Sequence, residues 1–182
     1  LVAVGRAGAG VNNIPVGNLS QAGIPVFNTP GANANAVKEL VLAAILISAR
    51  NVLPAANYVE TLNMIEPELK TEVEAAKKNF SGFELPGRKL GVIGLGKIGS
   101  LVASACLKLG MRVVGYDPTI TVDSAWNLST DVERATSLDE VVSGADFLTV
   151  HVPLVEDTKN LLSKPVISNL KNGATILNFS RD

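Results

Sequence analysis

The 182-residue sequence contains one cysteine and one histidine, and its net charge is only −1. A single thiol excludes an internal disulfide framework and favours a reducing, cytoplasmic setting. The near-zero net charge provides no field that would attract nucleic acid or an anionic membrane. The longest apolar run, residues 40–47, is far shorter than the roughly 20 residues of a membrane-spanning helix. We therefore expect a cytoplasmic protein with neither nucleic acid nor membrane as a partner.

An initiating methionine and a secretory leader are also missing from the sequence. The chain opens on the apolar residues 1–4, which have the character of a strand already under way. This beginning predicts a fragment of a longer protein.

The scarcity of aromatic side chains limits what can fill the core. Aromatic residues make up 4% of the sequence and hydrophobic residues 47%, with a mean hydropathy of +0.28. Val, Ile, Leu and Ala must therefore fill the core, which is typical of an α/β protein with buried parallel strands. We expect Cys106, Met111 and Trp126 to be packing residues.

The first 80 residues contain short apolar runs separated by turn residues. The pattern predicts a strand, a glycine-rich loop, a short helix, a second strand and two longer helices, at residues 1–4, 5–10, 16–21, 26–27, 35–62 and 66–80. The first long helix is apolar nearly all round over residues 40–48, so we expect it to be buried between layers.

From residue 89 onward, predicted strands and helices alternate regularly. The strands fall at residues 89–94, 112–116, 147–152 and 174–179, with a further short strand possible at 133–136. The helices fall at 97–109, 137–143 and 164–170, and residues 124–127 are either irregular or helical. Alternation at this spacing predicts an α/β fold with a doubly wound parallel sheet.

A glycine motif follows the first of these strands. Residues 94–99 form the pattern G-x-G-x-x-G between a strand and a helix, and Asp117 ends the next strand. Gly94 would permit a tight turn, Gly96 would let the backbone approach a pyrophosphate, and Gly99 would let the helix pack closely on the strand. This context favours a dinucleotide site over a glycine turn without a ligand.

Two side chains refine that prediction. Asp117 can accept hydrogen bonds from ribose hydroxyls and would repel a 2′-phosphate, so we expect NAD rather than NADP. Lys97 either steers phosphate or points to solvent.

Four stretches together resemble the D-isomer-specific 2-hydroxyacid dehydrogenase family. They are the glycine loop with its arginine, the segment from Asn28 through Glu39, the glycine motif with Asp117, and the segment from His151 that leads to Arg181, located at residues 5–13, 28–39, 94–117 and 151–181. The resemblance implies a Rossmann-type NAD-binding domain over residues 30–182, incomplete at its C-terminus. It also implies a remnant of a flavodoxin-like substrate domain over residues 1–29.

The resemblance implies roles for particular residues. Arg181 would be catalytic, holding the substrate carboxylate and polarising the developing carbonyl, unless it forms a surface ion pair. The substrate-binding residues would be Arg6, Ala7, Gly8 and Asn33. The alternatives are a plain glycine turn for the loop and a helix N-cap for Asn33.

The cofactor would be NAD, and no metal is implied. Thr158 would contact the pyrophosphate unless its hydroxyl is a local cap. The full set of implied cofactor residues is Gly94, Gly96, Lys97, Ile98, Gly99, Asp117, His151, Val152, Pro153, Thr158, Phe179 and Ser180.

The implied reaction is hydride transfer between a small 2-hydroxy acid and NAD. An arginine followed by Ala-Gly is typical of the family's phosphoglycerate branch, which oxidises 3-phosphoglycerate to 3-phosphohydroxypyruvate in the first step of serine biosynthesis. The alternatives are glyoxylate, hydroxypyruvate or lactate as substrate, or a non-catalytic NAD-binding module. Two departures from the family pattern affect the loop, Ala9 and Asn12, and a third places Asp182 where a glycine normally follows the arginine.

The family's catalytic histidine and its partner carboxylate fall beyond residue 182. His151 is on the cofactor side by the family pattern and is not assigned as the base, so we expect this chain to be inactive alone. The resemblance also implies a homodimer through the long helix, because residues 40–47 exposed alone would form a large apolar patch.

Overall fold

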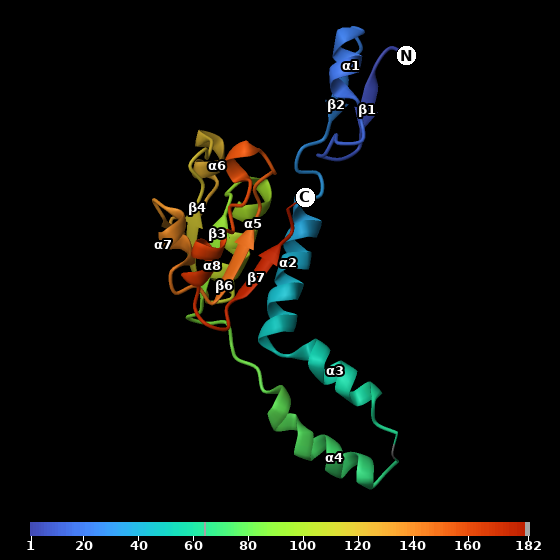
Figure 1. The fold of residues 1–182 in the computed structure, drawn as a ribbon, viewed down its shortest axis with the longest axis vertical. Helices are drawn as coiled ribbons and strands as arrows, with labels where there is room; N and C mark the ends of the chain where they lie inside the picture. The colour runs from blue at the N-terminus through green and yellow to red at the C-terminus, as the bar shows by residue number, and fades with distance from the viewer. Residues whose placement is uncertain (64, 181–182) are drawn as a thin grey trace.

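The computed structural model describes residues 1–63 and 65–180. Figure 1 shows a small N-terminal unit, a long helix with a helical arm, and a parallel sheet with helices on both faces. No helix in the two described ranges is long and apolar enough to cross a membrane. The predicted catalytic Arg181 lies outside the described residues.

The N-terminal unit is a two-stranded parallel sheet. Its strands β1 (Val4–Arg6) and β2 (Val26–Asn28) are connected through the helix α1 (Val16–Gln21), which buries no residue. The prediction of a strand at residues 1–4 is wrong in its bounds, because the pairing with β2 begins at Val4 and extends through Arg6. The predicted domain division at residue 30 falls in the connection from β2 to the next helix and stays a prediction.

The long helix predicted over residues 35–62 is two helices, so that prediction is wrong. Helix α2 (Ala34–Ala49) and helix α3 (Val52–Glu60) meet at Asn51, whose φ of 51° is left-handed. Asparagine tolerates this conformation better than most residues. Its side-chain Nδ2 also donates to the Ser81 carbonyl oxygen at 2.9 Å, which holds the turn.

Helix α2 is buried on one side only, which corrects the expectation that it is buried between layers. Val41 and Ile45 are fully buried, whereas Leu40 is 57% exposed and Leu46 44% exposed. The reason is that α2 packs against the sheet domain on one side, and the opposite side faces outward.

The helical arm consists of α3, α4 (Glu68–Ala76) and the short 3-10 helix η1 (Lys77–Phe80), and it reaches away from the sheet in Figure 1. The helix predicted from residue 66 begins at Glu68 instead, because Pro67 is its N-cap. Tyr58 of α3 and Phe80 of η1 pack with ring centroids 5.2 Å apart, which joins the two sides of the arm.

The sheet domain confirms the predicted doubly wound parallel fold. Its five strands are β3 (Lys89–Ile93), β4 (Arg112–Tyr116), β5 (Glu133–Arg134), β6 (Phe147–Val150) and β7 (Thr175–Asn178), and all neighbours are parallel. The spatial order is β5-β4-β3-β6-β7. The order therefore reverses between β3 and β6, and such a switch point is where open α/β sheets bind ligands.

Helices cover both faces of this sheet. Helix α5 (Lys97–Lys108) and α2 pack on one face, and α7 (Leu138–Val142) with α8 (Lys164–Ser168) on the other. Alternate strand residues enter the two cores, as Phe147 and Leu148 of β6 show. Short helices α6 (Val122–Trp126) and η2 (Glu156–Thr158) lie in the connections.

The three predicted packing residues behave differently. Cys106 is fully buried and Met111 is 3% exposed, as predicted. Burial raises the pKa of the Cys106 thiol to about 12, which keeps it protonated and unreactive. The prediction for Trp126 is wrong: it is 83% exposed, because α6 is a short surface helix with no buried residue.

Candidate functional site

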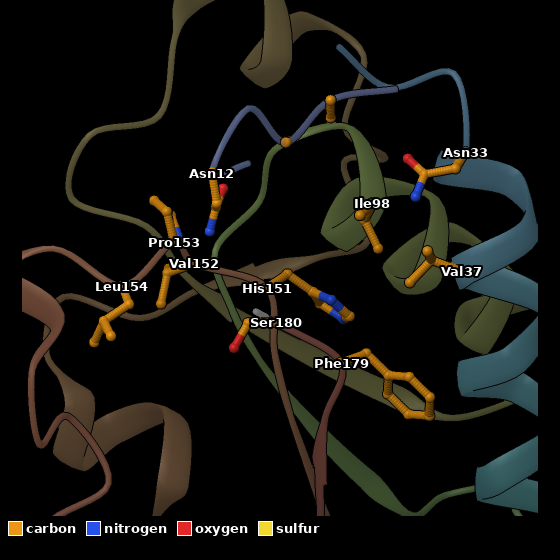
Figure 2. Close-up of a pocket in the computed structure, with 12 residues that line it drawn as sticks. Asn12, Asn33, Val37, Ile98, His151, Val152, Pro153, Leu154, Phe179 and Ser180 are labelled. Carbon is orange, nitrogen blue, oxygen red and sulfur yellow. The ribbon is translucent and has the colours of Figure 1, made fainter. Parts of the chain in front are cut away.

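A cavity of about 490 Å³ opens at the carboxyl edge of the sheet, where β6 and β7 end beside the start of α5. Figure 2 shows its walls, with the His151 ring extending toward Val37 and Phe179. The lining residues are Ala9, Gly10, Asn12, Asn33, Val37, Ile98, His151, Val152, Pro153, Leu154, Phe179 and Ser180. The cavity therefore joins the N-terminal loop, the first turn of α2 and the edge of the sheet.

The three motif glycines differ in what surrounds them. Gly94 has φ +88°, and a Cβ there would lie 2.8 Å from Val152 Cγ1. A Cβ on Gly99 would collide with the Gly94 carbonyl oxygen, so Gly99 permits the close packing of helix on strand. A Cβ on Gly96 would meet no atom within 4 Å. Packing therefore does not require glycine at position 96, and open space there suits a ligand that approaches the backbone.

The start of α5 supplies donors to that space. Gly96 is the N-cap of α5 and makes no side-chain cap. The first N–H groups of any helix lack intrahelical partners, and the helix dipole adds a partial positive charge. These groups fit the pyrophosphate of a dinucleotide.

Asp117 is held in a fixed orientation. Its Oδ2 accepts from the Leu95 N–H at 2.9 Å, and its Oδ1 accepts from the Thr119 N–H at 3.0 Å. The carboxylate thus links the end of β4 to the glycine motif. It lies on the wall of a separate cavity of about 460 Å³, so the structure places it beside the motif and outside the 490 Å³ cavity.

Lys97 is the first residue of α5, and its side chain turns toward the segment before α2. Its Nζ donates to the Pro30 carbonyl oxygen at 2.8 Å. The side chain is also exposed, and its role toward phosphate stays a prediction.

His151 is unsuited to act as a general base. Its Nε2 lies 3.0 Å from the hydroxyl of the buried Thr149, and its buried Nδ1 has no hydrogen-bond partner among the described residues. Burial lowers its pKa to about 4, whereas a general base at neutral pH needs a pKa near 7. Among the described residues that line the cavity, His151 has the only titratable side chain.

The segment after His151 separates two hollows. Val152, Pro153 and Leu154 line both the 490 Å³ cavity and a smaller one of about 200 Å³ that also includes Thr158. The Thr158 hydroxyl donates to the Pro153 carbonyl oxygen at 2.6 Å and accepts from the Val155 N–H at 2.8 Å. The structure thus uses the only proton of this hydroxyl for local capping.

Of the predicted substrate residues, one lines the cavity and three do not. Asn33 is the N-cap of α2 by position, yet its side chain makes no cap hydrogen bond and instead lines the cavity. The Arg6 Nε donates to the Gly10 carbonyl oxygen at 3.2 Å, so the arginine folds over its own loop. Neither Arg6, Ala7 nor Gly8 is part of the cavity lining.

The turn after β7, at the edge of the site, is held by the side chain of Asn178, which was not among the predicted site residues. Asn178 Oδ1 accepts from the Ser180 N–H at 3.0 Å and from the Ser180 hydroxyl at 2.6 Å, which fixes the turn after β7. Phe179 and Ser180 line the cavity as predicted residues. An Asx turn after a strand was the available signal for Asn178.

Five residues that line the 490 Å³ cavity also escaped prediction: Ala9, Gly10, Asn12, Val37 and Leu154. Val37 carried a weak signal, because it follows Asn33 by one helical turn and shares its face. The loop residues carried none beyond the glycine pattern. Among the described residues no group of three or more His, Cys, Asp or Glu is arranged to hold a metal ion.

Comparison with known proteins agrees with this geometry. Residues 42–182 match the model of the D-isomer specific 2-hydroxyacid dehydrogenase NAD binding domain. The chain is 37% identical to a D-3-phosphoglycerate dehydrogenase of Methanocaldococcus jannaschii over 181 residues, covering 100% of the chain and 32% of that protein. It is 36% identical to a hydroxypyruvate reductase of Thermotoga maritima, covering 98% of the chain and 53% of that protein. The chain thus spans a third to a half of these relatives.

Solved structures give the same result. The D-mandelate dehydrogenase of Rhodotorula graminis superimposes with a TM-score of 0.80 at 27% identity, over 98% of this chain and 51% of that one. A D-lactate dehydrogenase of Aquifex aeolicus complexed with NAD and lactic acid gives a TM-score of 0.76 at 28% identity, over 100% of this chain and 50% of that one.

The open space at Gly96, the first N–H groups of α5 and the anchored Asp117 all lie within the matched NAD-binding domain. The chain is a member of the D-isomer-specific 2-hydroxyacid dehydrogenase family and contains its NAD-binding domain.

Proposed function

We propose that this chain serves a cytoplasmic NAD-dependent oxidation of 3-phosphoglycerate to 3-phosphohydroxypyruvate. The observation that carries the proposal is the 490 Å³ cavity, because one wall comes from the N-terminal loop and the other from the NAD-binding edge of the sheet. A cleft with these two walls can hold a small acid beside the cofactor. The similarity to a phosphoglycerate dehydrogenase supports the phosphorylated substrate.

The residues of the chain would then bind and orient rather than transfer protons. NAD, when bound, supplies the hydride acceptor. The α5 N-terminus and the space at Gly96 would hold its pyrophosphate, and the Asp117 carboxylate would accept from a ribose hydroxyl. Arg181 remains our candidate for the group that holds the substrate carboxylate.

The N-terminal loop would hold the acid at its other end. Arg6 uses one nitrogen in its bond to the Gly10 carbonyl oxygen, and a guanidinium has five N–H donors. Its remaining donors suit a phosphate or a carboxylate. Backbone N–H groups of the loop would add to this contact.

Steady-state NADH oxidation tests the substrate, and it requires a protein that contains this chain together with the catalytic histidine expected beyond residue 182. We expect kcat/KM for 3-phosphohydroxypyruvate to exceed that for hydroxypyruvate and glyoxylate by tenfold or more, and NADPH to be a poor donor. Arg6→Met should reduce this preference, whereas the control Arg50→Met, on an exposed residue at the end of α2, should not.

The outcomes separate the alternatives. Equal or higher efficiency with hydroxypyruvate would refute the phosphorylated substrate and favour the chemistry named for the Thermotoga maritima relative. NADH binding without turnover of any acid would favour a non-catalytic NAD-binding module.

We also propose that a second copy of the chain covers the outward side of α2 and α3. Large apolar side chains are exposed there, namely Leu40, Leu46, Val52, Leu53 and Val59. A two-fold dimer would bury the same patch on both copies. Sedimentation of the wild type and of Leu40→Lys tests this: we expect a dimer and a monomer respectively, and a monomeric wild type would refute the proposal.

A further inference from the structure

The N-terminal unit touches the sheet domain through one polar contact. Within residues 1–63 and 65–180, the bond from Lys97 Nζ to the Pro30 carbonyl oxygen is the only hydrogen bond between the first 33 residues and residues 89–180. Lys97 belongs to the cofactor motif, and Pro30 belongs to the segment 29–33 that connects β2 to α2, here called the hinge. The contact therefore joins the cofactor site to the hinge directly.

The hinge fits around the lysine side chain. Gly31 has φ +82°, and a Cβ at this position would collide with Lys97 Cδ and lie 3.1 Å from its Nζ. The lysine stem thus lies against the glycine while its ammonium reaches the neighbouring carbonyl. A residue with a side chain at position 31 would displace Lys97.

The hinge is in turn bonded to the N-terminal loop. The Thr29 N–H donates to the Gly8 carbonyl oxygen at 3.1 Å, and the Asn28 Nδ2 donates to the Ala9 carbonyl oxygen at 2.8 Å. Movement of the hinge would therefore carry the loop that walls the cavity. A chain of contacts runs from the cofactor motif through Lys97 to the opposite wall.

Lys97 has a stronger potential partner close by. It follows Gly96, at the space that suits the cofactor pyrophosphate. A phosphate offers the ammonium a hydrogen bond and also the attraction of an opposite charge, whereas a neutral carbonyl offers the hydrogen bond alone. Because the side chain is exposed, the ammonium is able to leave Pro30 for phosphate.

We propose that Lys97 is a positioning residue that couples NAD binding to the hinge. Without cofactor, its ammonium holds the hinge against the sheet domain. With cofactor, the ammonium turns to phosphate and the hinge is released, so the N-terminal loop can move over the cleft. Coupling of this kind is reciprocal, so the Lys97–Pro30 bond also weakens NAD binding. The inference rests on NAD binding alone and not on the proposed substrate.

Hydrogen–deuterium exchange of the hinge, with NADH as probe, tests the coupling. In the wild type, NADH should accelerate exchange of a peptide spanning residues 28–36 by about fivefold, the factor that corresponds to one hydrogen bond. In Lys97→Met, exchange should be fast already and NADH should not change it. Lys97→Arg should restore the NADH response. Lys108→Met, which removes an exposed lysine from the last turn of α5, is the charge control and should behave as the wild type.

Affinity for NADH distinguishes coupling from a structural role. Gly31→Ala and Lys97→Met both free the hinge, but only the second removes the ammonium. We expect Gly31→Ala to bind NADH as tightly as the wild type or about twofold more tightly, and Lys97→Met to bind about fivefold more weakly. Gly23→Ala controls for backbone strain, since Gly23 has φ +68° with no atom near its Cβ position.

The contrary results are equally specific. Hinge exchange that NADH leaves unchanged or slows in the wild type would overturn the proposal, as would an unchanged NADH response in Lys97→Met. Equal losses of NADH affinity in Gly31→Ala and Lys97→Met would show that the contact only supports the fold of the site.

Discussion

Two strand–helix–strand units in this chain follow one sequence pattern and have opposite burial. Each has a short strand, a glycine-rich stretch, a helix and a parallel strand, β1-α1-β2 and β3-α5-β4. In the second unit, four of the five residues of β3 are buried, and α5 buries Gly99, Val102, Ala103 and Cys106. In the first, neither strand has a buried residue and α1 buries none. Local pattern therefore defines the elements, and the surrounding sheet decides whether they form a core.

The largest expected difference between the units is in stability. Phe147 of β6 is fully buried against the second unit, whereas Phe27 of β2 is 63% exposed. Truncation of a buried phenylalanine leaves a cavity, so Phe147→Ala should lower the free energy of unfolding by about 3–5 kcal/mol. Phe27→Ala should change it by less than about 0.5 kcal/mol. Urea denaturation measures both, and similar losses would contradict the comparison.

A smaller effect should follow from pH, because the only histidine of the chain, His151, has a buried ring nitrogen. Burial lowers the pKa of His151 to about 4 from 6.5, so the folded state favours the neutral ring. As pH falls below 6.5 the unfolded chain takes up a proton first, and stability declines until about pH 4. At pH 5 the loss should be about 2 kcal/mol.

His151→Gln tests this pH dependence. Unfolding free energies of the variant and the wild type should differ in slope between pH 7 and 5, with the variant nearly flat. The chain has no other histidine, and unperturbed carboxyl groups titrate mostly below this range. Parallel curves would mean that burial does not keep the ring neutral.

Alanine substitution of one glycine in each unit compares the two units in their effect on NADH binding. Gly96 in the cofactor motif and Gly17 in α1 both have open space at the Cβ position, and Gly96 has an ordinary φ of −69°. Alanine at either position should leave folding intact. Gly96→Ala should weaken NADH binding about tenfold, equal to about 1.4 kcal/mol, while Gly17→Ala should not alter it. Calorimetric titration with NADH measures both affinities. An unchanged NADH affinity in Gly96→Ala would mean that the pyrophosphate binds elsewhere.

The smallest effect concerns Thr158. Its hydroxyl bonds hold the turn at η2, so Thr158→Val should cost about 1 kcal/mol of stability. NADH affinity should change less than twofold. A loss of affinity of tenfold without a loss of stability would restore the role in pyrophosphate binding that the sequence suggested.

Prediction from sequence succeeded where local pattern and burial coincide. The β3-α5-β4 unit and its glycine motif follow from a continuous apolar run, a glycine turn and an acidic strand end, all within about 30 residues. Gly99 shows this directly, since its spacing already indicates the close packing that the structure contains.

Prediction failed where distant segments decide. The break between α2 and α3 at Asn51 depends on the bond of Asn51 to the Ser81 carbonyl oxygen, 30 residues away. Leu40 is exposed because it lies on the side of α2 that does not pack against the sheet domain. The Lys97–Pro30 contact spans 67 residues. Nothing in the sequence around Lys97 or around Pro30 indicates that the two residues are in contact.

Comparison of NADH with NADPH binding to the wild type and to Asp117→Asn tests the central claim most directly. The carboxylate is fixed by the Leu95 and Thr119 N–H groups at the end of β4, where it would accept from a ribose hydroxyl and repel a 2′-phosphate. We predict that the wild type binds NADH at least tenfold more tightly than NADPH and that Asp117→Asn narrows this ratio. Equal or tighter binding of NADPH by the wild type would contradict the assignment of this edge of the sheet as an NAD site.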